Sequence, residues 1–186
     1  MILFLDTETT GLPKQRNASP KMVDLWPRMV SVAWTASVPA NAPCEELIVR
    51  PTDYTIPTAA SNVHGITTEH AAEHGCDITE VMETLMARLE KCTYIACYNV
   101  AFDKNVLLSE AYRLKNQKFI DTLTGIKWYC VMRRVKAHLD INRYIKLAVA
   151  HELICAKHAN KQYQYHNAGD DVLATRDIML SILGET

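Results

Sequence analysis

Two carboxylates, Asp6 and Glu8, directly follow the apolar segment Met1–Leu5. Such a segment is typical of a strand buried on both faces. Residues two apart on a strand point to the same side, so Asp6 and Glu8 would face the same way. A charge at the rim of a buried strand is costly unless it is paired or coordinates a metal ion. An ordinary polar turn after a strand would explain the same pattern, and both interpretations remain open here.

A further carboxylate, Asp103, lies where the apolar run Tyr94–Tyr98 leads into a helical pattern. The local sequence is Asn-Val-Ala-Phe-Asp, which is again a junction between a strand and a helix. The helix dipole favours an acidic side chain in the first turn of a helix. A purely structural role for Asp103 is therefore the alternative to a functional one.

The third motif contains His166 and Asp171, in the sequence His-Asn-Ala-Gly-Asp-Asp. Side chains five apart on one α-helix lie about 140° apart, so these two cannot share a helix face. Asn167 as N-cap, with Asp170 three residues later, places His166 just outside the helix and Asp171 in its first turn. A loop histidine could then swing over a site that Asp171 lines. A capped surface helix with a spare histidine is the alternative.

Alternating strands and helices must position these three motifs. We expect strands at Met1–Leu5, Met29–Val38, Glu46–Arg50, Tyr94–Tyr98 and Lys127–Val131, and helices at Thr67–Gly75, Asp77–Lys91, Phe102–Leu114, Ile145–Ile154 and Ala168–Leu183. Three strands followed by alternating helices and strands predict one α/β domain over residues 1–186, with a mixed sheet. Thr9–Met29 is polar and rich in proline, which predicts a long loop, and long loops in compact domains are usually functional or mobile.

The composition excludes several classes of protein. Of the 186 residues, 48% are hydrophobic and 22% are charged, which is typical of a folded domain and excludes a disordered chain. The net charge of −1 argues against coating long nucleic acids by charge alone, though not against holding a short nucleic-acid end through metal ions. Six scattered cysteines favour free thiols in a reducing compartment. The apolar opening is too short for a signal peptide or a membrane span, so we expect a cytoplasmic protein without membrane association.

Together, the three acidic motifs resemble those of the DnaQ-like 3′→5′ exonucleases, the DEDDh branch of the ribonuclease H-like superfamily. The resemblance extends from Phe4 to Ala174 and rests on the order of Asp-x-Glu, Asn-x-x-Phe-Asp and His-x-Ala-x-x-Asp-x-x-Ala. Shorter matches are Trp26–Val30, Val63–Thr67 and Lys146–Ala148. Tyr98 departs from the pattern, because the family often has histidine there, and the loop 13–29 is longer than usual. The resemblance implies an α/β, ribonuclease H-like fold, with a mixed five-stranded sheet flanked by helices.

The resemblance also implies a metal-dependent chemistry for the matched positions. Asp6, Glu8, Asp103 and Asp171 would be the metal-binding carboxylates, with Glu8 and His166 as the catalytic residues and His166 as the general base. Oxygen-only ligands suit two Mg²⁺ or Mn²⁺ ions, which can activate a water molecule and stabilise the leaving 3′ oxygen. An imidazole with a pKa of about 6.5 can take the proton from that water near neutral pH. The product would be a nucleoside 5′-monophosphate.

Further positions would contact the terminal nucleotide by the same resemblance. They are Thr7, Thr10, Leu12, His64, Tyr98, Asn99 and Phe102. Leu12 would pack against the terminal base, whereas Phe102 is more easily explained as a core residue. The loop 13–29 carries four cations, Lys14, Arg16, Lys21 and Arg28, with Asp24 as its single acid. We therefore expect this loop to contact phosphates upstream of the scissile one, with a solvated loop without contacts as the alternative.

The expected partner is a single-stranded nucleic acid with a free 3′ end, and DNA is the first choice. An exoribonuclease acting on short RNA or RNA 3′ ends is one alternative. Another is an inactive exonuclease-like binding subunit, against which the presence of all five chemical positions argues. A proofreading role beside a DNA polymerase is also open. The end of the sequence at Thr186, soon after the last expected helix, favours a stand-alone enzyme.

Overall fold

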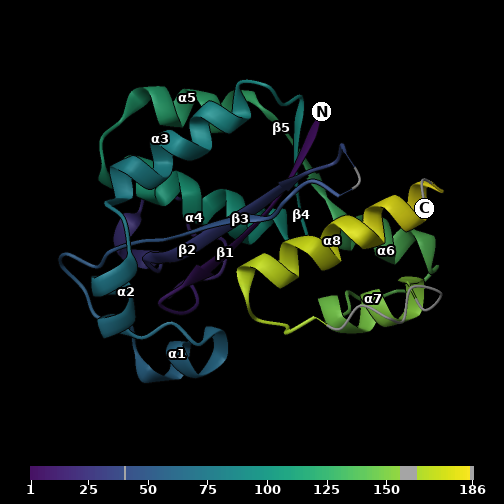
Figure 1. The fold of residues 1–186 in the computed structure, drawn as a ribbon, viewed down its shortest axis with the longest axis horizontal. Helices are drawn as coiled ribbons and strands as arrows, with labels where there is room; N and C mark the ends of the chain where they lie inside the picture. The colour runs from purple at the N-terminus through teal and green to yellow at the C-terminus, as the bar shows by residue number, and fades with distance from the viewer. Residues whose placement is uncertain (40, 156–162, 185–186) are drawn as a thin grey trace.

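The computed structural model describes residues 1–39, 41–155 and 163–184 and shows a five-stranded mixed sheet (Figure 1). The strands are β1 (Ile2–Thr9), β2 (Met29–Ala36), β3 (Glu45–Ile48), β4 (Tyr94–Cys97) and β5 (Lys127–Cys130), in the order β3-β2-β1-β4-β5. β2 runs antiparallel to its neighbours β1 and β3, whereas β1, β4 and β5 are parallel. The predicted mixed five-stranded sheet is confirmed.

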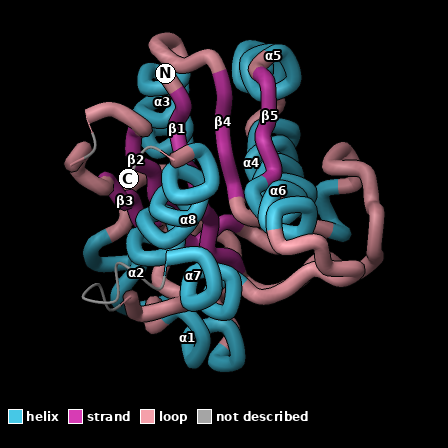
Figure 2. The backbone as a smooth tube through the Cα atoms, turned by 90° about the vertical axis from the view of Figure 1, so that its right-hand side faces the viewer, coloured by secondary structure: helices cyan, strands magenta, loops and turns pink. Residues whose placement is uncertain are grey.

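Helices cover both faces of this sheet (Figure 2). They are α1 (Thr58–His64), α2 (Thr68–His74), α3 (Ile78–Leu89), α4 (Val100–Arg113), α5 (Gln117–Gly125), α6 (Val131–His138), α7 (Leu147–Cys155) and α8 (Ala168–Leu183), with a short 3-10 helix η1 at Val23–Leu25. α3, α4 and α5 lie on one face, and α6, α7 and α8 lie on the other. α1 and α2 share a smaller cluster with Val30 of β2.

Side chains along β1 alternate between these two layers, as the two-residue period of a strand requires. Leu3 and Leu5 pack into the core that β1 forms with α3, α4 and α5. Phe4 packs into the opposite core, which contains residues of α6, α7 and α8. The central strand is therefore buried on both faces, as its apolar sequence predicts. The same alternation decides the direction of the polar residues that follow Leu5.

Several elements differ from the sequence-based expectation. β1 continues past Leu5 to Thr9, because its polar end pairs with β2 as far as Met29. Three helices, α1, α5 and α6, were not predicted. Each buries only two side chains: α6 buries Val131 and Val135, α5 buries Phe119 and Leu123, and α1 buries Ala60 and His64. A single pair of buried residues four apart is too short a pattern to indicate a helix.

The state of the cysteine thiols and the character of the helices bear on two expectations from composition, free thiols and the lack of membrane association. All six cysteines are free in the structure, as their scattered spacing predicts. Within the described ranges, no helix has the length and apolar character needed to cross a membrane.

Candidate active site

The polar end of β1 presents its side chains to both faces of the sheet. Asp6 and Glu8 have the same parity as Phe4 and point toward the α8 layer, whereas Thr7 points toward α4. β1 contacts both α4 and α8. The end of one strand therefore lies between the first turns of two helices, and each of those turns carries one of the predicted carboxylates.

On the α8 side, three carboxylates gather into a cluster. Asp6, Glu8 and Asp171 each offer one oxygen, and these oxygens all lie within 4.8 Å of one another. Asp171 is brought there by the first turn of α8, which packs on β1 and β2. Residues 163 positions apart in the sequence thus converge on one point. Such a cluster has the donor atoms that hard divalent cations prefer.

The fourth carboxylate, Asp103, lies on the α4 side and is held by Thr7. The backbone N–H and the hydroxyl of Thr7 both donate to Asp103 Oδ1, at 3.1 and 2.9 Å. Both residues are buried. Thr7 was predicted to contact the substrate, and in this structure its hydroxyl instead orients Asp103. Its predicted substrate contact is untested.

Burial and mutual repulsion make these carboxylates hard to ionise. Burial, followed by the charges of Asp171, Asp103 and Glu46, raises the pKa of Glu8 to about 8. Burial raises the pKa of Asp103 to about 7, although the two Thr7 hydrogen bonds lower it. The pKa of Asp171 rises to about 6, again through burial. Burial and the surrounding acids raise the pKa of Asp6 well above its ordinary range. Glu46 of β3 adds to this repulsion, and no motif in the sequence pointed to it.

Within the described residues, the negative charge of this site has no lysine or arginine as an ion-pair partner: no such pair includes Asp6, Glu8, Asp103 or Asp171. Buried carboxylates that remain unpaired are costly unless a cation binds between them. The donors are all oxygen atoms, which fits Mg²⁺ or Mn²⁺ better than a softer metal. The residues present therefore fit the expected metal ions.

His166 lies at the start of α8, directly beside Asp171. Its backbone N–H donates to both carboxylate oxygens of Asp171, at 3.2 and 3.4 Å, and its side chain is exposed. The side chain of Asn167 accepts from the N–H of Asp170 at 3.1 Å, so the predicted N-cap is confirmed. His166 has a φ of +69°, a left-handed conformation that is uncommon for a residue with a side chain. Strained backbone of this kind is concentrated at functional sites.

Four further residues were predicted to contact the substrate, namely Leu12, Asn99, Phe102 and Thr10. Leu12 is 82% exposed beyond β1, and Asn99 is exposed at the start of α4. Phe102 is partly buried, with its ring 6.4 Å from that of Trp26. The hydroxyl of Thr10 accepts from the N–H of Arg28 at 3.0 Å, which closes the loop that follows β1. Leu12, Asn99 and Phe102 thus remain open to a ligand.

Tyr98 and His64, which were also predicted to contact the substrate, form hydrogen bonds within the protein. The Tyr98 hydroxyl donates to the carbonyl of Ile145 at 2.7 Å, which ties β4 to the segment before α7. His64 is buried, and its Nδ1 accepts from the N–H of Ile66 at 3.1 Å. Burial lowers the pKa of His64 and favours its neutral form. No finding tests a substrate contact for either residue.

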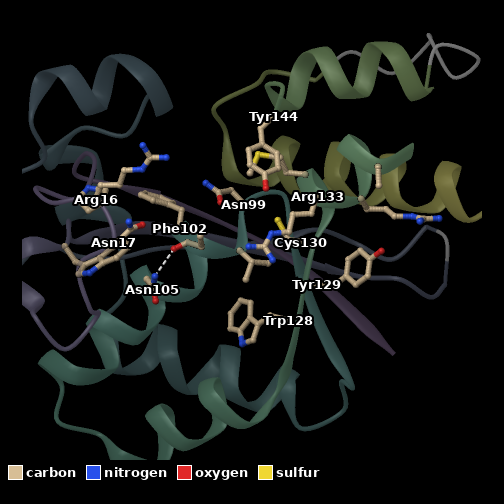
Figure 3. Close-up of a pocket in the computed structure, with 17 residues that line it drawn as sticks. Arg16, Asn17, Asn99, Phe102, Asn105, Trp128, Tyr129, Cys130, Arg133 and Tyr144 are labelled. Carbon is tan, nitrogen blue, oxygen red and sulfur yellow. Dashed lines mark hydrogen bonds between the residues drawn. The ribbon is translucent and has the colours of Figure 1, made fainter. Parts of the chain in front are cut away.

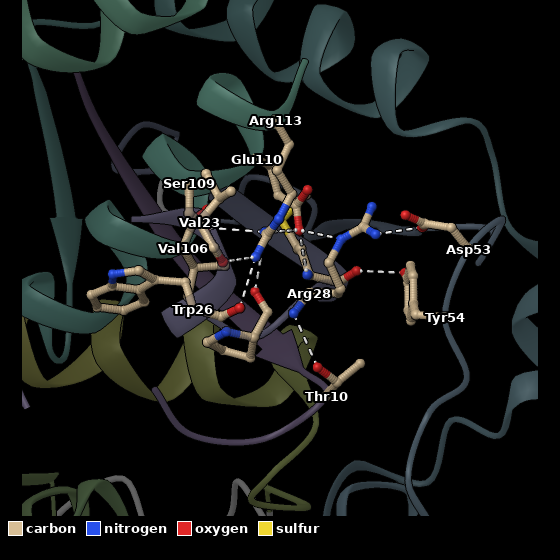
Figure 4. A network of polar contacts seen from close by, with 12 residues as sticks. Thr10, Val23, Trp26, Arg28, Asp53, Tyr54, Val106, Ser109, Glu110 and Arg113 are labelled. Carbon is tan, nitrogen blue, oxygen red and sulfur yellow. Dashed lines mark hydrogen bonds and ion pairs between the residues drawn. The ribbon is translucent and has the colours of Figure 1, made fainter. Parts of the chain in front are cut away.

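A second buried charge cluster lies at the other end of the loop between β1 and β2 (Figure 4). Glu110 of α4 accepts from Arg28 Nε at 3.2 Å and from Arg113 Nη1 at 2.8 Å. Arg28 also pairs with Asp53, and Arg113 donates to the carbonyl of Trp26 at 2.7 Å. Arg28 is one of the four loop cations that were expected to contact phosphates. The structure shows it in this network, whose central acid lies 82 positions away.

Solved structures share this fold. Exonuclease X in complex with 5′-overhanging duplex DNA is 19% identical with a TM-score of 0.62, over 100% of this chain and 93% of its own. Product-bound exonuclease I is 18% identical with a TM-score of 0.72, over 98% of this chain and 43% of its own. A zinc-bound complex of E. coli exonuclease I with single-stranded DNA is 19% identical with a TM-score of 0.69, over 99% and 40%. No protein-family model and no curated protein matches the sequence.

The chain therefore has the same fold as these solved structures, and the predicted fold class, a mixed five-stranded sheet flanked by helices, is confirmed. More particularly, the chain is similar to the exonucleases named I and X, as the three sequence motifs predict. It spans nearly the full length of the exonuclease X chain but less than half of the exonuclease I chains.

Proposed function

We propose that this chain is a metal-dependent 3′→5′ exonuclease that removes nucleoside 5′-monophosphates stepwise from single-stranded DNA. One observation carries the proposal: carboxylates from three separate motifs converge at the end of β1, and no described lysine or arginine forms an ion pair with them. A strand end with a purely structural role does not require carboxylates from separate motifs to converge. The fold, shared with exonuclease structures that contain DNA, supports this activity.

In this proposal, Asp6, Glu8 and Asp171 hold two divalent metal ions, with Asp103 completing the set from the α4 side. Mg²⁺ or Mn²⁺, when bound, would activate water and stabilise the charge that develops on the leaving 3′ oxygen. Thr7 keeps the Asp103 carboxylate in one orientation through its two hydrogen bonds. The raised pKa values mean that bound cations must also displace protons from these acids.

Glu8 and His166 are the residues that we assign to catalysis. The exposed imidazole of His166 accepts the proton of the attacking water, and the Glu8 carboxylate helps to hold that water in place. The backbone of His166 is fixed by its two hydrogen bonds to Asp171, whereas its side chain is free to reach the substrate. This combination suits a general base that acts beside the metal ligands.

The terminal nucleotide would lie between β1 and the start of α4. Leu12 supports this placement because it is a large apolar side chain left exposed immediately beyond the acidic cluster. Asn99 is exposed just before the turn that carries Asp103, where an amide can donate to a phosphate or sugar oxygen.

Hydrolysis of a 5′-labelled single strand tests the proposal. With Mg²⁺ or Mn²⁺, wild-type protein is expected to shorten a DNA oligonucleotide one residue at a time from the 3′ end, and EDTA is expected to stop the reaction. An RNA oligonucleotide of the same sequence is assayed in parallel, because a preference for RNA would replace DNA as the substrate. Binding without cleavage in both metals would instead support a non-catalytic subunit.

A further inference from the structure

A cavity of about 820 Å³ opens beside the candidate active site (Figure 3). One wall is the start of the long loop, around Arg16, and another is formed by β5 and α6. The first turn of α4 forms its floor, and Asn99 and Phe102 belong to its lining. Asp103 follows one residue after Phe102 on the same helix. A ligand that leaves the carboxylates along α4 therefore enters this cavity.

The cavity is opposite in charge to the site beside it. Arg16, Arg133 and Arg134 line it, and the described lining contains no acidic residue. No ion pair in the described ranges includes any of these three arginines. Unpaired arginines along a groove are suited to the phosphates of a nucleic-acid strand. This concentration of positive charge arises in a chain whose net charge is −1.

Aromatic side chains occupy the same walls. Trp128 and Tyr129 come from β5, and Tyr144 follows α6. The indole N–H of Trp128 donates to the carbonyl of Leu123 at 2.9 Å, which fixes the ring. Tyr144 is 53% exposed, and the Lys136 ammonium lies over its ring at 5.3 Å from the centroid. Aromatic rings beside unpaired cations are typical of surfaces on which unpaired bases stack, and bases within a duplex cannot reach them in this way.

We propose that this cavity binds the nucleotides upstream of the scissile bond in a single-stranded DNA substrate. Arg16, Arg133 and Arg134 contact phosphates, and Tyr144 stacks on a base. The inference rests on the proposed function for its direction, since the 3′ end lies at the carboxylates.

The cations of the long loop, residues 13–29, have different surroundings and therefore different roles in this proposal. Arg16 lines the cavity, whereas Arg28 is held by Glu110, and the Lys21 ammonium lies over the ring of Tyr112 at 5.9 Å. Lys14 is exposed and does not line the cavity. Arg16 is therefore the loop cation that we assign to the cavity, and two further arginines come from α6.

Binding of a 5′-fluorescein-labelled thymidine 12-mer, measured by anisotropy in EDTA, tests the cavity without cleavage. The variant Arg16→Gln/Arg133→Gln/Arg134→Gln is expected to bind at least about 10-fold more weakly. Its salt slope is expected to fall by about 2, because each lost phosphate contact removes about 0.7. The control Lys91→Gln/Lys115→Gln/Lys118→Gln removes three exposed charges from the opposite end of the parallel strands and is expected to bind within twofold of wild type.

A second variant and a second substrate separate this proposal from a folding defect and from the proposed function. Tyr144→Ala keeps all charges and is expected to weaken 12-mer binding about fivefold or more. With Mg²⁺, hydrolysis of a thymidine dinucleotide, which has no phosphate upstream of the scissile one, is expected to stay within twofold of wild type in the triple arginine variant, which shows that the active site is intact.

Other results would overturn the cavity proposal, the choice of DNA or the exonuclease activity. Unchanged 12-mer binding in both cavity variants, equal loss in the lysine control, or no binding by wild type would overturn the cavity proposal. Tighter binding of a uridine 12-mer would overturn the choice of DNA. Wild-type binding that depends on the arginines, without hydrolysis of either substrate, would refute the exonuclease and leave the cavity as a binding site.

Discussion

The loop between β1 and β2 is flanked by two buried acidic sites that are balanced in different ways. At its far end, Glu110 lies between Arg28 and Arg113 and also accepts from the backbone N–H of Met29 at 2.9 Å. At its near end, Asp6 and Glu8 lie beside further carboxylates without a lysine or arginine in an ion pair, among the residues that the structure describes. Two arginines of the chain thus balance the far site, whereas no lysine or arginine in the described part of the chain pairs with the near site.

This difference separates a structural charge from a functional one. A buried carboxylate with two arginines and a backbone donor is stabilised within the folded chain, and it holds the loop against α4. Carboxylates that repel one another gain stability only when protons or external cations bind. The near end of the loop is then a site for external cations, and the far end a structural ion-pair network.

Asp103→Asn is expected to reduce hydrolysis of a single strand by at least about 10³-fold. The amide keeps the shape of the side chain and can still accept from Thr7, but it cannot supply the negative charge that a divalent cation needs. Single-turnover hydrolysis with Mg²⁺ measures the loss. The matched control is Asp121→Asn, an exposed position on α5, which should retain activity. Wild-type rates in Asp103→Asn would remove this residue from the metal site.

His166→Ala is expected to lower the hydrolysis rate by about 10²- to 10⁴-fold, the usual range for removal of a general base. The backbone hydrogen bonds to Asp171 survive this change, so stabilisation by Mg²⁺ should persist. His74→Ala, at an exposed position on α2, provides the control. If His166→Ala no longer responds to Mg²⁺ in thermal unfolding, His166 is a metal ligand and not the base.

Glu110→Gln is expected to lower the free energy of unfolding by about 3–5 kcal/mol, because it leaves the partly buried Arg113 without an acid and Arg28 with only the exposed Asp53. Urea unfolding measures this change. Glu45→Gln breaks an exposed pair with Arg88, at 2.7 Å, and should cost no more than about 1 kcal/mol. Equal effects in the two variants would mean that burial does not distinguish the Glu110 network from a surface ion pair.

The metal-free protein is expected to lose stability as the pH rises. The pKa values of Asp171, Asp103 and Glu8, about 6, 7 and 8, all lie above those of unfolded acids, near 4. The folded state therefore binds protons more tightly, and its advantage disappears between about pH 5 and pH 8. Unfolding in EDTA across this range should show a progressive loss of stability as the pH rises, and saturating Mg²⁺ should reduce that loss. A flat profile would contradict the uncompensated cluster.

Local patterns were sufficient to predict part of this site. The two-residue period places Asp6 and Glu8 on one side of β1, and the Asn167 cap places Asp171 in the first turn of α8. The contact between Thr7 and Asp103 could not be predicted, because it depends on how α4 packs against the opposite face of the sheet. For the same reason the ion pair between Arg28 and Glu110 could not be predicted, since Glu110 lies 82 positions away on α4.

Thermal unfolding of wild type and Asp6→Asn, in EDTA and with increasing Mg²⁺, tests most directly whether the acids at the end of β1 form a metal site. In EDTA, Asp6→Asn should melt at the same temperature as wild type or higher, because the variant has lost one repelling charge. Mg²⁺ should raise the melting temperature of wild type and raise that of Asp6→Asn much less, because ligands that bind the folded state stabilise it. A variant that melts lower in EDTA, together with a wild type that does not respond to Mg²⁺ or Mn²⁺, would contradict the account.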